Sequence, residues 1–250
     1  MGQSLTTKYL LAAIVLAVAA SAAIAQSGPA IPATVKATYK VYKAAIWIGT
    51  IEERFTRDGS NYRIVSDTET AGPLRLFLRD QLTVTSEGTI GATGLRPDRY
   101  RFTRRDDQKK NITSLFEWDK HQIVSRHAGE DETFDLPAGT QDRISAMYQF
   151  MFSIPRTPEV SVWMTQGKKA EFYRYRKLGE PVLRVNNENV PTVYYARDAG
   201  EGEAKAHLWL ATEKHYLPVK IRFEDASGAA LEQVLVSLQT EWGSIGPPTP

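Results

Sequence analysis

Apolar and polar residues alternate along most of the chain from residue 34 onward, which is the pattern of β-strands that bury one face. One such stretch runs from Ile46 to Phe55, and turn residues at 58–61 separate it from another at 62–66. This arrangement predicts a β-hairpin. The alternation predicts further strands over residues 39–43, 82–85, 99–104, 112–118, 122–126, 132–136, 160–165, 169–176, 182–185, 193–197, 205–210, 218–223 and 231–238.

Residues 140–154 depart from this alternation and predict one main α-helix. Their apolar side chains recur at spacings of three and four, which places Ile144, Met147, Tyr148 and Met151 on one helical face. Thr140 is the expected N-cap, and Pro155 ends the helix. A short second helix or turn is expected over residues 72–78.

The predicted strands are joined by tight turns, so they favour an antiparallel meander over β-α-β units. A sheet of about fourteen strands has to curl or close. The sequence therefore predicts a mainly β fold, a large curled antiparallel sheet (a half-barrel or open barrel), with the helix packed in its concave face. We expect a single β-rich domain over residues 34–240, preceded by a linker at 26–33 and followed by a disordered tail at 241–250.

The first 25 residues have the layout of a secretory signal peptide. Lys8 is their only charged residue, an apolar run covers residues 9–20, and Ala23-Ile24-Ala25 forms a small-x-small cleavage site. The apolar run is shorter than the about 20 residues that span a bilayer. We therefore expect cleavage near Ala25, a periplasmic protein, and no transmembrane anchor in the mature chain.

The net charge and the absence of cysteine exclude some classes of ligand and some kinds of chemistry. The whole chain carries a net charge of +2, and removal of Lys8 with the signal peptide leaves +1. This balance argues against a general polyanion binder, so no nucleic acid is expected. The chain contains no cysteine, which excludes disulfides, a lipid-modified cysteine, thiol nucleophiles and thiolate metal sites.

Four segments occur in an order that resembles a known family. They are residues 42–49, which end in Ile48-Gly49, residues 94–100 (GLRPDRY), residues 141–145 (QDRIS) and residues 209–221 (WLATEKHYLPVKI). Together they resemble the exported bacterial family called domain of unknown function number 3108, over about residues 36–238. The resemblance implies a β-rich periplasmic domain and no particular activity. The curled sheet with a helix is also similar in outline to periplasmic lipoprotein carriers, a likeness of fold alone.

Catalytic signatures are weak in this sequence. The four histidines are His121, His127, His207 and His215, and none has a metal-binding spacing, so no metal or cofactor is predicted. His207 shares a strand face with Trp209, and Glu203 extends this row, which we interpret as a solvated strand face.

The remaining polar residues do not form a recognisable hydrolase site in the sequence. The chain has no GxSxG motif, and Asp142 lies within hydrogen-bond reach of Ser145, which we interpret as a carboxylate that caps the helix or anchors it to the sheet. The adjacent Glu52 and Glu53 point to opposite faces of a strand, so they cannot act together on one glycosidic bond.

The predicted strand at residues 169–176, with Lys168 before it, is rich in basic residues. We interpret it as a surface that contacts anionic lipid or envelope glycan, or alternatively as a solvated basic edge of the sheet. Its cations are Lys168, Lys169, Arg174 and Arg176. Phe172, Arg174 and Arg176 share one face of this strand, and Tyr173 and Tyr175 share the other.

A ligand cavity between the sheet and the helix is the leading binding hypothesis, with core packing as the alternative. The large apolar residues proposed to line it are Trp47, Phe77, Phe116, Trp118, Met147, Met151, Trp163 and Trp209. The sequence thus favours a non-enzymatic envelope protein that binds an apolar or amphiphilic molecule. An envelope hydrolase acting on glycan or ester, and a structural protein-interaction domain, remain as alternatives.

Overall fold

The computed structural model describes residues 31–71, 81–153, 157–200, 202–241 and 243–245. Residues 31–250 form one compact unit. Its first eight strands are β1 (Thr34–Lys43), β2 (Ile46–Asp58), β3 (Asn61–Thr70), β4 (Gln81–Gly91), β5 (Gly94–Arg104), β6 (Ile112–Glu117), β7 (Gln122–His127) and β8 (Glu130–Asp135). Each pairs antiparallel with the next, as short turns between alternating stretches predict.

The second half of the chain contributes the remaining elements of the fold. Its strands are β9 (Gln141–Asp142), β10 (Glu159–Thr165), β11 (Ala170–Gly179), β12 (Val182–Val185), β13 (Glu188–Arg197), β14 (Lys205–Ala211), β15 (Leu217–Glu224), β16 (Ala230–Thr240) and β17 (Gly243–Ile245). Short helical turns are η2 (Gln108–Lys110), η3 (Trp118–Lys120), α1 (Ser145–Tyr148) and η4 (Gln149–Met151).

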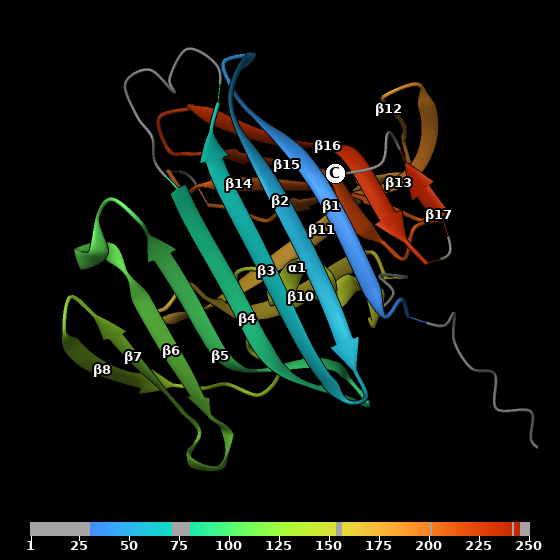
Figure 1. The fold of residues 1–250 in the computed structure, drawn as a ribbon. Coiled ribbons are helices and arrows are strands. Elements are labelled where there is room, and N and C mark those ends of the chain that lie inside the picture. The colour runs from blue at the N-terminus through green and yellow to red at the C-terminus, as the bar shows by residue number, and fades with distance from the viewer. Residues whose placement is uncertain (1–30, 72–80, 154–156, 201, 242, 246–250) are drawn as a thin grey trace, which may run out of the picture. The chain divides into compact units, whose positions relative to one another are not determined.

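Strand β1 joins the two halves, because it pairs with β2 on one side and with β16 on the other. From β16 the sheet continues through β15, β14, β13, β11 and β10, and it ends at β9, which runs parallel to β10. Strands β8 and β9 are the two ends of this order and do not pair with each other, so the sheet is curled but not closed. Figure 1 shows β1–β8 on one side of α1 and β10, β11, β14 and β15 on the other.

The predicted fold class is confirmed, and the described residues form seventeen strands in place of about fourteen. Among the described residues, β9 and β17 are strands that the alternation does not predict. They have two and three residues, too few to show a period of two.

The helix is much shorter than predicted. The prediction covered residues 140–154, whereas α1 spans four residues and η4 three more. The backbone of residues 141–142 is extended and pairs with Met164 and Thr165 of β10, so no helix can begin there. Thr140 is not the N-cap, because its hydroxyl donates to the Pro137 carbonyl at 2.7 Å. The second predicted helix, at 72–78, and residues 154–155 lie outside the described residues.

Two hydrophobic clusters fill the concave side of the sheet. The larger contains Phe55, Ile64 and Ile123 from the first half, together with Tyr148 and Met151 from the helical segment. The second lies on β11, β13, β14 and β15 and includes Phe150 of η4. Met147 packs against both clusters, and α1 contacts both β5 and β15, so this segment bridges the two halves of the curled sheet.

Candidate functional site

Two glutamine side chains attach residues 141–151 to the start of β5. The Gln141 amide donates to the Leu95 carbonyl at 2.8 Å, and the Gln149 amide oxygen accepts from the Leu95 N–H at 2.7 Å. The Gln149 amide nitrogen also donates to the Thr93 carbonyl at 2.7 Å. Gly94 makes this approach possible, because a Cβ there would lie 2.5 Å from the Gln149 amide and its φ is +106°.

Asp142 is the centre of a buried hydrogen-bond network that fixes the start of α1. Its Oδ1 accepts the N–H groups of Ile144 at 3.0 Å and Ser145 at 2.8 Å, and its Oδ2 accepts the Ser86 hydroxyl. The Ser86 oxygen lies 3.0 Å from the Tyr62 hydroxyl. Burial raises the pKa of Asp142 to about 6, although these hydrogen bonds oppose the rise. The N-cap position of α1 is Ile144, and the predicted role of Asp142 as an anchor between this helix and the sheet is confirmed by its hydrogen bonds to Ser145 and Ser86.

Glu53 of β2 holds the other end of the segment. Its Oε2 accepts the Tyr148 hydroxyl at 3.1 Å, and its Oε1 accepts the Ser66 hydroxyl at 3.3 Å. Burial raises the pKa of Glu53 to about 7, while its two hydrogen bonds and the charge of Arg143 lower it. The two carboxyl groups thus tie one short helix to β2 and β4.

The turn between β10 and β11 docks on the concave face of β6 and β7. The Ser125 hydroxyl donates to the Gly167 carbonyl, and the Ser114 and Ser125 hydroxyl oxygens lie 2.9 Å apart. The Gly167 N–H donates to the Thr165 hydroxyl at 2.9 Å, which closes the turn. This contact brings β10 and β11 opposite β5 and β6.

A cavity of about 310 Å³ lies between these two pairs of strands. Its lining residues are Tyr100, Phe102, Ile112, Arg143, Met164, Gln166, Lys168, Lys169, Glu171 and Tyr173. Small-molecule sites typically have volumes of about 300–1,000 Å³, and this cavity is at the lower end of that range. The lining combines an apolar part with three cations and one carboxylate.

The charges of this cavity are unevenly paired. Lys169 forms an ion pair with Glu171 at 2.8 Å, and Glu171 also accepts the Tyr173 hydroxyl at 2.8 Å. Burial and this carboxylate raise the pKa of Tyr173 to about 12, so the phenol keeps its proton. Arg143 and Lys168 are exposed, and neither has an ion-pair partner among the described residues. The cavity therefore keeps a surplus of positive charge.

The eight apolar residues proposed from the sequence do not gather in this cavity. Phe116 and Met151 are buried in the larger cluster, while Trp118, Met147 and Trp209 pack at its border. The rings of Trp163 and Phe172 are tilted against each other with their centroids 5.2 Å apart, Trp47 is exposed, and Phe77 lies outside the described residues. Their role in ligand binding stays a prediction.

The four basic residues separate into two pairs. Lys168 and Lys169 line the cavity. Arg174 pairs with Glu159 at 3.1 Å, and Arg176 pairs with Asp198 at 2.9 Å. Tyr173 and Tyr175 are buried and Phe172 is exposed, which confirms the predicted division of this strand into two faces.

Sequence reasoning missed Arg143 as a cavity residue. Arg143 follows Asp142, whose hydrogen bonds determine the direction of the backbone there. No local sequence pattern shows which strands Arg143 faces. Gly167 before Lys168 and Lys169 is a signal that was available, since a glycine in a short turn permits close approach of two backbones.

The polar groups of a hydrolase do not meet in one cleft of the described structure. His207 lies with Trp209 at a ring distance of 6.2 Å, as predicted, and its Nδ1 lies 2.8 Å from the Tyr194 hydroxyl. Glu203 does not extend this row, because it lies before β14 and pairs with Arg197 at 2.9 Å. Glu53 and Asp142 instead contact the helical segment.

No cluster of three or more metal-ligating residues occurs in the described parts of the chain. No helix in these same parts is long and apolar enough to cross a membrane.

The fold and the cavity define a single-sheet, curled β domain with a site of small-molecule size. The chain belongs to the family "Protein of unknown function (DUF3108)", whose model matches residues 37–235, and the predicted family is thereby confirmed. No curated protein matches the chain.

Two solved structures were compared with this fold. A beta-barrel-like protein of domain of unknown function DUF1849 from Brucella abortus is 11% identical, with a TM-score of 0.54 over 84% of this chain and 99% of that one. A domain named for outer membrane lipoprotein sorting, from Vibrio parahaemolyticus, is 13% identical, with a TM-score of 0.23 over 83% of this chain and 69% of that one. The first likeness supports the fold, and the second is too distant to support an argument.

Proposed function

We propose that this protein is an exported, periplasmic envelope protein that binds an amphiphile with an acidic headgroup in the cavity between β5, β6, β10 and β11. The observation that carries the proposal is Arg143, an exposed guanidinium at an otherwise partly apolar cavity, without an ion-pair partner among the described residues. The signal-peptide pattern of residues 1–25 supports the location.

The cavity offers separate surfaces for the two parts of such a ligand. Phe102, Ile112 and Met164 provide apolar contacts, and a methionine adapts to chains of different shape. Arg143 offers a planar pair of donors that suits a carboxylate or a phosphate. Lys168 adds a second positive charge.

Binding explains this site better than hydrolysis does. Each buried carboxyl group with a raised pKa already accepts hydrogen bonds that hold α1 in place, so neither is free to act on a substrate. A nucleophile with a base and an oxyanion site is not assembled in the described residues around the cavity.

The test compares decanoate with decanol by isothermal titration calorimetry, below their aggregation concentrations. We expect wild-type protein to bind decanoate more tightly, and Arg143→Gln to weaken decanoate binding about tenfold, or about 1.4 kcal/mol, while binding of decanol stays unchanged. Arg174→Gln is the matched control, because this arginine lies on the other face and pairs with Glu159. Equal decanoate affinity in wild type and Arg143→Gln would contradict the proposal.

The native ligand can be sought in the same preparation. An organic extract of protein purified gently from the periplasm is analysed by mass spectrometry. A stoichiometric acidic amphiphile in the wild-type extract, reduced in Arg143→Gln, is the expected result. An empty extract from a well-folded protein would instead favour the interaction-domain alternative.

A further inference from the structure

Exposed apolar side chains gather at one end of the sheet. Eight large hydrophobic residues of the described chain are exposed, and four of them lie near the β1–β2 and β15–β16 turns. These four are Ile46 (57% exposed), Trp47 (39%), Phe223 (43%) and Leu231 (42%).

The strand register places three of these four residues in one row at the ends of adjacent strands. Lys43 is opposite Ile46 on one side and opposite Leu231 on the other, and Leu231 is opposite Phe223. Side chains directly opposite each other on paired strands have Cβ atoms about 4.5–5.5 Å apart. A row therefore crosses the ends of β2, β1, β16 and β15 on one face of the sheet, and Trp47, which is opposite Tyr42, projects from the other face at the same end. We call these four apolar residues, with Lys40 and Lys43, the tip surface.

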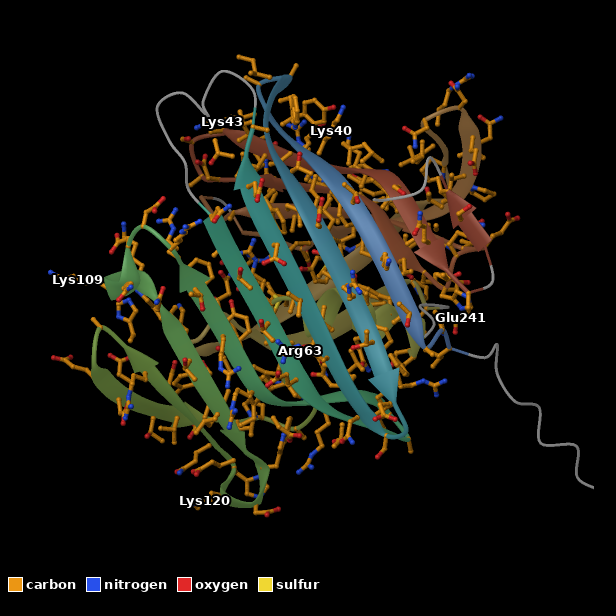
Figure 2. All side chains as sticks on the ribbon, in the orientation of Figure 1. Lys40, Lys43, Arg63, Lys109, Lys120 and Glu241 are labelled. Atoms are coloured by element: carbon orange, nitrogen blue, oxygen red, sulfur yellow. The ribbon has the colours of Figure 1, made fainter. Side chains whose placement is uncertain are left out.

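The cations of the tip surface are available to an anionic partner. Lys40 and Lys43 have no ion pair among the described residues, and the Lys40 ammonium lies 5.1 Å from the centre of the Trp47 ring. Figure 2 shows both lysines at the same end of the sheet, opposite the end that carries Lys120.

The carboxylates nearby are already engaged. Glu224 pairs with Lys205 at 3.2 Å, and Glu232 pairs with Arg222 at 3.1 Å. Asp225 accepts the Ser227 and Ala229 N–H groups at 2.9 and 3.0 Å, and Lys43 influences its pKa only from a distance. The tip surface thus presents positive charge next to exposed apolar groups.

A cavity of about 470 Å³ adjoins Lys43 on this rim. It lies between the turn at residues 44–45 and the turn at 228–230, and Tyr42, Arg222 and Glu232 also line it. Its phenol and cations are donors for the oxygens of a phosphodiester headgroup, although Glu232 and Glu224 already occupy Arg222.

We infer that the tip surface docks on a phospholipid bilayer that contains anionic lipid. Three apolar side chains and Lys43 form a row across four strand ends, and Trp47 projects from the other face of the same rim, so this rim can meet a flat surface end-on. Tryptophan with lysine is the combination that favours the interface between water and acyl chains. Lys40 and Lys43 match the negative charge of such a surface. This inference concerns a different surface from the proposed cavity and does not depend on that cavity's ligand.

The experiment is co-sedimentation of the purified protein with vesicles of two compositions, phosphatidylglycerol with phosphatidylethanolamine, and phosphatidylcholine alone. We expect binding to the anionic vesicles that falls at least fivefold in the Ile46→Ser, Trp47→Ser double variant. Leu178→Ser, Val182→Ser is the matched control, because these side chains are 58% and 60% exposed and lie on β11 and β12. Thermal melts confirm that each variant is folded.

A second double variant removes the two lysines and keeps the apolar residues, so it separates the contribution of charge from that of apolar contact. Lys40→Ser, Lys43→Ser is expected to lose the preference for anionic vesicles, whereas Lys109→Ser, Lys120→Ser is expected to keep it. Equal binding by wild type and the Ile46, Trp47 variant overturns the inference, as does an absence of binding to both vesicle types. Loss of a dimer in the tip variant, without any vesicle binding by wild type, would overturn it in favour of a second copy of the chain as the occupant.

Discussion

Gly167 lies where the β10–β11 turn meets the concave face of β6 and β7. Its φ is +95°, and a Cβ there would lie 2.4 Å from Cγ2 of Ile112 and 3.1 Å from the Ser114 hydroxyl. Both the backbone conformation and the close approach favour glycine. This single residue therefore permits the contact that places Lys168 and Lys169 at the cavity.

The substitution Gly167→Ala tests that contact. We expect it to lower the free energy of unfolding by about 2–4 kcal/mol, because strain at a positive φ is added to a clash in a packed region. Gly139→Ala is the matched control, since Gly139 has a φ of +74° with nothing within 4 Å of a Cβ. Its expected cost is about 1–2 kcal/mol. Urea unfolding measures both, and equal losses would show that the contact with Ile112 is unimportant.

Local chemistry decides which single residues can be predicted from sequence. Asp142 was recognisable as a cap or anchor, because its partners Ile144 and Ser145 are two and three residues away. The other side of its network, Ser86, is 56 residues away and has no local signal. Arg143 was missed for the same reason, since its place at the cavity depends on how β9 pairs with β10.

At the scale of elements, the helical segment is held by side chains more than by its own length. A four-residue α-helix followed by a 3-10 turn has few internal hydrogen bonds and cannot persist alone. The expected 15-residue helix failed because periodicity of apolar residues does not reveal a competing strand pairing. The apolar spacing still located the buried side chains Ile144, Tyr148 and Met151.

The link between Glu53 and Tyr148 makes this element sensitive to pH. The folded protein holds the Glu53 proton more tightly than the unfolded chain does, because its pKa is raised from 4.5 to about 7. The folded state thus binds more protons between these values, and the free energy of unfolding falls as the pH rises from about 4.5 to 7. Ionised Glu53 would remain hydrogen-bonded to Tyr148 but at the expense of burying its charge.

Glu53→Gln is expected to remove part of this dependence. The amide keeps an acceptor and adds a donor for Tyr148 and Ser66, and it does not ionise. We expect the fall in unfolding free energy between pH 5 and 7.5 to be smaller than in wild type by about 1–2 kcal/mol. Glu52→Gln, on the opposite face of β2, is the control. Parallel pH profiles for wild type and Glu53→Gln would contradict the assignment.

At the scale of the whole described unit, alternation and turns were enough to predict one curled antiparallel sheet, because each strand pairs mainly with its neighbour in sequence. The exceptions are the pairing of β11 with β13 and the joining of β1 to β16, which brings residues 35–43 against residues 231–240. No local pattern specifies such a distant pairing, and none indicates whether the sheet closes. The open edges at β8 and β9 follow from these long-range pairings.

The open edge at β8 carries a high density of acidic residues. Glu130, Asp131, Glu132 and Asp135 are exposed on this strand, and Asp131 pairs with Arg126 of β7 at 2.7 Å. An unpaired edge can add a strand from another molecule, and like charges on two such edges oppose this pairing. We interpret the acidic side chains as a device that keeps the sheet from extending between molecules.

Glu130→Thr, Glu132→Thr removes two of these charges and adds residues that favour strands. We expect the weight-average mass in analytical ultracentrifugation to rise more steeply with protein concentration than in wild type, and high salt to shift wild type toward the variant because it screens the repulsion. Glu52→Thr, Glu69→Thr removes the same charge from exposed positions on β2 and β3, which have neighbours on both sides. If this control associates as strongly, the net charge of the molecule, and not the edge of β8, governs self-association.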